Sequence, residues 1–61
     1  MKLNIEPNFT DGDAFYAALA NIYNSLPPEE VMTVNAKLVL LLANHIGEQE
    51  ILEQAIVAAT Q

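Results

Sequence analysis

The feature that most constrains this chain is a run of apolar residues at positions 38–43, inside the longer stretch 36–47. The run is far shorter than the ~20 apolar residues that a membrane-spanning helix needs. The stretch is also too apolar for a surface helix that buries one side and exposes the other to water. We therefore expect a helix that makes apolar contacts on more than one side.

The small size of the chain limits how much core it can build. A domain of 61 residues buries only about 60% of the surface that its unfolded chain exposes. Its core then supplies only about 3–5 kcal/mol without further support. Disulfides and thiolate metal sites are excluded because there is no cysteine, and a single histidine rules out a multi-histidine metal site. Association is the remaining support, and an apolar content of 52% favours it.

The charge balance argues against several partners. Eight acidic residues face two lysines and no arginine, which gives a net charge of −6. Nucleic acids and anionic membrane surfaces both attract basic proteins, so neither is an expected partner. A basic protein surface would be attracted, although scattered acidic residues also serve ordinary solubility.

Residues 1–10 are predicted to form an extended arm. Leu3 and Ile5 alternate with polar residues, and Pro7 ends the pattern. A single short strand is unstable in water. The arm, with Phe9, therefore either packs on its own helices or is added to a partner. Its early polar residues do not form a signal peptide, so we expect a cytoplasmic protein.

Three helices are predicted, at about 11–25, 28–45 and 48–60. Thr10 or Asp11 can cap the first helix, and Pro28 suits the first turn of the second. Gly47 is the expected left-handed stop of the second helix. The expected fold is all-α: a compact three-helix bundle over 11–61 with a short extended N-terminal arm.

Helical periodicity assigns most apolar residues to core-facing sides. These sides comprise Phe15, Ala18, Leu19, Ile22 and Leu26; Val31, Val34, Leu38, Leu41, Leu42, His45 and Ile46; and Ile51, Leu52, Ala55, Ile56 and Ala59. Leu40 and Val57 fall outside them and are therefore candidate contacts for a partner. Tyr16 and Tyr23 lie on the flank of the first helix. Such a pair can line a ligand pocket, but it more commonly forms a core edge or an interface rim.

Little in the sequence indicates catalysis. His45 is the only candidate general base, and no nucleophile motif surrounds Ser25, the only serine. His45 and Glu48 together are too few ligands for a structural metal. A filled core in so short a chain leaves little room for the ~300 Å³ pocket of a small-molecule site. We expect no catalytic, cofactor-binding or metal-binding residues, and interpret His45 as a helix cap or interface residue.

Three segments carry a resemblance to a known family: Pro-Asn-Phe at 7–9, Asp-Ala-Phe-Tyr-Ala-Ala-Leu at 13–19, and the stretch 35–47 that ends Leu-Leu-Leu-Ala-Asn-His-Ile-Gly. With these segments the chain resembles a small bacterial family, the domain of unknown function 2783, over nearly its whole length. The family has no assigned activity, so the resemblance implies no catalytic residues for this chain. Its members occur alongside flavin-dependent monooxygenases that hydroxylate aromatic compounds, which implies an accessory role.

Two functions therefore stand as hypotheses, with a small enzyme that uses His45 as a weaker third. The first is a non-catalytic small accessory subunit that docks on a larger enzyme, with a flavin-dependent aromatic monooxygenase as one candidate. The second is a self-associating helical protein, a homodimer or homotetramer with a structural or regulatory role. The interface candidates are Leu3, Ile5, Phe9, Tyr16, Tyr23, Leu40, His45 and Val57.

Overall fold

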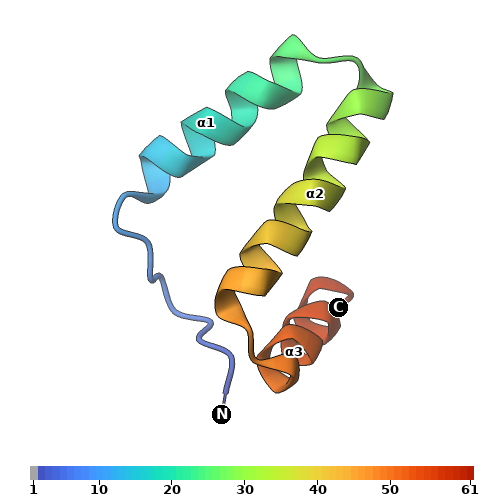
Figure 1. Ribbon diagram of the computed structural model, residues 1–61. Helices are drawn as coiled ribbons and strands as arrows, with labels where there is room; N and C mark the ends of the chain where they lie inside the picture. The colour runs from blue at the N-terminus through green and yellow to red at the C-terminus, as the bar shows by residue number, and fades with distance from the viewer. Residues whose placement is uncertain (1) are drawn as a thin grey trace.

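Three helices make up the computed structural model, which describes residues 2–61; Met1 of the predicted arm lies outside that range. They are α1 (Gly12–Ser25), α2 (Pro28–Ile46) and α3 (Gln49–Ala59), and the described residues form no strand. Helices α1 and α2 form a hairpin, and α3 turns at a sharp corner across the end of α2 (Figure 1). The all-α class and the three-helix bundle with an extended arm are thus confirmed.

Local sequence signals set the helix ends. The Asp11 side chain, rather than that of Thr10, caps α1 by accepting a 3.0 Å hydrogen bond from the backbone N–H of Ala14. Helix α2 begins with Pro28, whose ring already holds a helical φ. It ends at Gly47, which adopts the left-handed conformation with φ 78° and donates its N–H to the Ala43 carbonyl at 2.8 Å.

The helices pack only against their neighbours in the chain. Helix α2 contacts both α1 and α3, whereas α1 and α3, both wholly described, do not contact each other. The half-buried apolar side chains are Leu3 in the arm, Leu19, Ala20, Ile22 and Leu26 before α2, Val31, Val34, Leu38 and Ala43 in α2, and Ile51, Leu52 and Ala55 in α3. No helix in residues 2–61 is both long and apolar enough to cross a membrane.

The predicted core faces are only partly covered, and this corrects the sequence-based expectation. No described residue is fully buried. Members of those faces that remain exposed are Phe15, Ala18, Leu41, Leu42, His45, Ile46, Ile56 and Ala59. The physical reason is the missing contact between α1 and α3, which leaves the third side of the bundle open.

Candidate interaction surfaces

The whole chain exposes more surface than a folded monomer of its size. Its accessible area is 5416 Å², whereas a monomer of 6.7 kDa exposes about 3,900 Å². Its radius of gyration is 13.1 Å, against about 10.5 Å for a typical domain of this length. About 1,500 Å² of surface is thus left uncovered, which is close to what two standard interfaces remove from one partner.

The first candidate surface is a groove between the N-terminal arm and α3. The backbone N–H of Leu3 donates a 2.8 Å hydrogen bond to the Gln54 side-chain oxygen, which holds the arm beside α3. The groove is widely open to solvent, with a volume of about 930 Å³, and its apolar lining residues include Leu3, Ile5 and Val57. Glu53 adds a carboxylate to the lining. We call this surface the arm–α3 groove.

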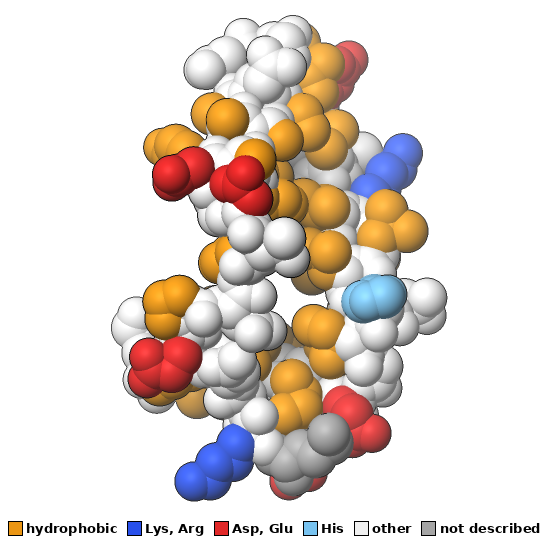
Figure 2. Space-filling model, turned by 90° about the vertical axis from the view of Figure 1, so that its left-hand side faces the viewer, with side chains coloured by type: hydrophobic (Ala, Val, Ile, Leu, Met, Phe, Trp, Pro, Cys, Tyr) orange, Lys and Arg blue, Asp and Glu red, His pale blue; other side chains and the backbone are white. Residues whose placement is uncertain are grey.

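The second candidate surface is a hollow between the N-terminal part of α1 and the C-terminal part of α2. It encloses about 500 Å³ and is lined by Phe9, Thr10, Asp11, Phe15 and Leu42. The rings of Phe9 and Phe15 lie 5.9 Å apart, centre to centre, at an angle of 30°. We call this surface the α1–α2 hollow. Figure 2 shows hydrophobic side chains along the molecule and around a hollow near its centre.

These two open hollows differ from the expectation that a filled core leaves little room for a pocket. Both arise because the helices and the arm do not close over one another. The lining of the α1–α2 hollow is mainly apolar, with Asp11 as its one charged residue. The arm–α3 groove combines four apolar side chains with Lys2, two glutamates and three glutamines. This chemistry suits contact with another protein better than orientation of a small polar substrate.

The structure brings some of the predicted interface residues together and separates others. Leu3, Ile5 and Val57 line the arm–α3 groove, and Phe9 lines the α1–α2 hollow. Leu40 and Tyr16 are 70% and 73% exposed and belong to neither surface. Sequence reasoning missed Phe15 and Leu42 as surface residues, because periodicity assigned both to the core.

The two tyrosines have different environments. The hydroxyl of Tyr23 donates a 2.8 Å hydrogen bond to the side-chain oxygen of Asn35, which ties α1 to α2. Tyr16 is largely exposed on the same helix. Tyr23 is therefore a contact within the hairpin, and Tyr16 is the member of the pair that a partner can reach.

We expect Tyr23→Phe to lower the free energy of unfolding by about 0.5–1 kcal/mol, because it removes this hydrogen bond and keeps the ring. Tyr16→Phe is the matched control and should change the free energy of unfolding by less than about 0.5 kcal/mol. Urea titration of both variants at one protein concentration measures the difference. Equal effects would show that the Tyr23–Asn35 bond does not stabilise the hairpin.

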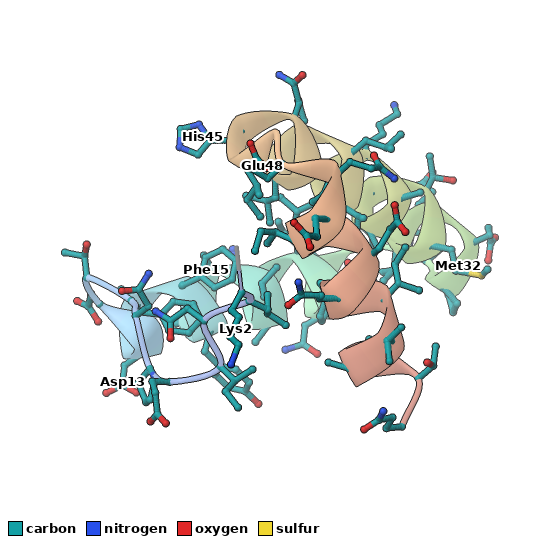
Figure 3. The ribbon with its side chains drawn as sticks, turned by 90° about the horizontal axis from the view of Figure 1, so that it is seen from below. Lys2, Asp13, Phe15, Met32, His45 and Glu48 are labelled. Carbon is teal, nitrogen blue, oxygen red and sulfur yellow. The ribbon has the colours of Figure 1, made fainter. Side chains whose placement is uncertain are left out.

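His45 lies at the surface near the end of α2. Its ring points away from the three helices, while Glu48 lies on the neighbouring turn into α3 (Figure 3). Within residues 2–61, no group of three or more metal-ligating side chains comes together. His45 is therefore a surface residue rather than part of a metal-binding cluster.

Together these features define a small all-α protein with two open hollows, one mainly apolar and one of mixed polarity. A family model described as "Protein of unknown function (DUF2783)" matches residues 3–61. The chain therefore belongs to this family, which confirms the resemblance seen in the sequence. No curated protein and no solved structure matches the chain.

Proposed function

We propose that this chain is a non-catalytic, cytoplasmic accessory subunit that docks on a larger enzyme. The observation that carries the proposal is the excess of about 1,500 Å² of accessible surface over a folded monomer of the same mass. Helices α1 and α3 do not contact each other, so the chain leaves this surface uncovered. The described residues also include no cysteine that could form a disulfide. A protein partner would cover this surface and supply the missing stabilisation.

The arm–α3 groove is the docking surface in this proposal. It brings Ile5, which is 81% exposed, near Val57, which is 55% exposed. Apolar side chains of this kind form the centre of protein interfaces. Two glutamates and one lysine line the groove, and the chain has a net charge of −6. This excess of acidic residues favours an enzyme surface with basic residues around an apolar centre.

A flavin-dependent aromatic monooxygenase is the first partner to test. This choice rests only on what the resemblance to the family implies. The untagged chain should be purified from its own cell, and the native complex weighed by mass spectrometry. The expected result is a stoichiometric complex with a large subunit that shows a flavin absorption spectrum.

Point variants then test the docking surface. We expect Val57→Glu to weaken binding to the purified enzyme at least about tenfold, because it places a charge at an apolar contact. Met32→Glu is the matched control: Met32 is 74% exposed and lies on α2, outside the groove (Figure 3). Titration calorimetry should show binding by Met32→Glu and its loss in Val57→Glu. Equal affinities of the two variants, or no complex with any larger protein, would contradict the proposal.

A further inference from the structure

The α1–α2 hollow lies where the contact between α1 and α2 stops short. We call the line along which the apolar sides of these two helices face each other the seam. In α2, Leu41 and Leu42 follow Leu38 by three and four residues and so continue the side of the helix that Leu38 half-buries. In α1, Phe15 precedes Leu19 by four residues and continues that side in the same way. Yet Leu41 and Leu42 are 68% and 47% exposed. The apolar stripe of each helix thus runs on past the part that its neighbour covers.

The hairpin that carries this seam is almost free of charge. No acidic or basic residue lies between Asp13 and Glu29, and Lys37 is the only lysine, arginine or acid between Glu30 and Glu48. The outer side of a helix in a monomer normally carries charged residues. The centre of a protein interface is depleted of them. The acidic residues of the hairpin instead gather at its ends, and one of them, Asp11, lines the α1–α2 hollow.

We propose that a second copy of this chain fills the α1–α2 hollow, so that two hairpins form a four-helix core. Antiparallel hairpins that each expose an apolar side form four-helix bundles by packing those sides together. The contact would be isologous, with the same seam contributed by both copies. Asp11 is the one charged residue in the lining of the hollow. In this dimer of two chains of net charge −6, the two Asp11 carboxylates lie at the rim, where water screens them, and uncharged side chains such as Phe15 and Leu42 form the contact.

The uncovered surface area is large enough for a contact with a second copy of the chain. A standard interface removes about 800 Å² from each partner. The excess of about 1,500 Å² over a folded monomer is large enough to include such an interface, whether or not the arm–α3 groove forms a second one. The dimer uses a different surface from the enzyme contact and does not rest on it.

Sedimentation of the purified, untagged chain alone tests the dimer. The expected species has twice the 6.7 kDa chain mass at micromolar concentration. Leu42→Glu should raise the dimer dissociation constant at least about tenfold, because it puts a carboxylate into the seam. Leu40→Glu adds the same charge two residues away on the exposed side of α2 and should leave the dimer intact. A monomeric parent chain, or equal dissociation by both variants, would overturn the inference.

Cysteine cross-linking keeps the test decisive if Leu42→Glu fails to fold. The chain has no cysteine, so Leu42→Cys and Leu40→Cys each add a single thiol. A short bifunctional reagent that alkylates thiols should join two copies of Leu42→Cys, by forming one C–S bond with each thiol, and leave Leu40→Cys unlinked. Equal cross-linking of both variants would overturn the inference. If the chain is a dimer but binds no enzyme, only the proposed accessory function is contradicted. If the chain is a monomer and binds the enzyme, only the proposed dimer is contradicted.

Discussion

Leu38→Ala should be the most damaging single truncation, lowering the free energy of unfolding by about 2 kcal/mol. Large-to-small changes at fully buried leucines cost about 2–5 kcal/mol, and Leu38 falls at the low end because it is half-buried. A core this small supplies only about 3–5 kcal/mol. The variant should therefore lose roughly half of its stability, with a melting temperature about 8–16 °C lower.

Leu40→Ala is the matched control, because it removes the same atoms two residues further along α2. Leu40 is 70% exposed, so its truncation should change the free energy of unfolding by less than about 0.5 kcal/mol. Both variants should be melted at one protein concentration, since association makes the melting temperature depend on concentration. A larger loss for Leu40→Ala than for Leu38→Ala would mean that the half-buried side of α2 is wrongly placed.

Gly47→Ala should lower the free energy of unfolding by about 1 kcal/mol. The backbone of Gly47 has φ 78°, a left-handed conformation that costs a residue with a Cβ about 1–2 kcal/mol. The alanine recovers part of this cost by reducing the freedom of the unfolded chain. Because Gly47 lies at the corner between α2 and α3, thermal melting should show the loss as a lower midpoint.

Gly12→Ala is the control for this change. Gly12 does not have a positive φ, and an added Cβ would meet the Phe9 side chain at 3.7 Å, an ordinary contact. Alanine at this first position of α1 should therefore be neutral or stabilise the protein by up to about 1 kcal/mol. Similar losses at both glycines would contradict the assignment of the left-handed corner to Gly47.

The fold was largely predictable because its signals are local. Asp11, Pro28 and Gly47 mark helix ends by hydrogen bonding and backbone geometry that involve only nearby residues. The helix bounds in the structure lie within one residue of those predicted. The docking of the arm was left open, because its bond from Leu3 to Gln54 joins residues far apart in the sequence.

The candidate surfaces were less predictable. Leu40 and Val57 could be assigned to the surface, since each falls on the polar side of its own helix. Phe15 and Leu42 could not, because they share a helix side with residues that the structure half-buries. Helical periodicity tells which side of a helix is apolar, but it does not tell how far along that side a neighbouring helix reaches.

The sequence by itself determined that this protein is three helices built around an apolar segment, with an excess of acidic residues and no cysteine for a disulfide. It determined this because caps, prolines and periodicity act over a few residues. Only the tertiary structure decided that α1 and α3 do not meet, and that the apolar stripes of α1 and α2 stay open around Phe15 and Leu42. That outcome depends on the angle between helices and on where each one ends in space, which follow from packing and not from local sequence.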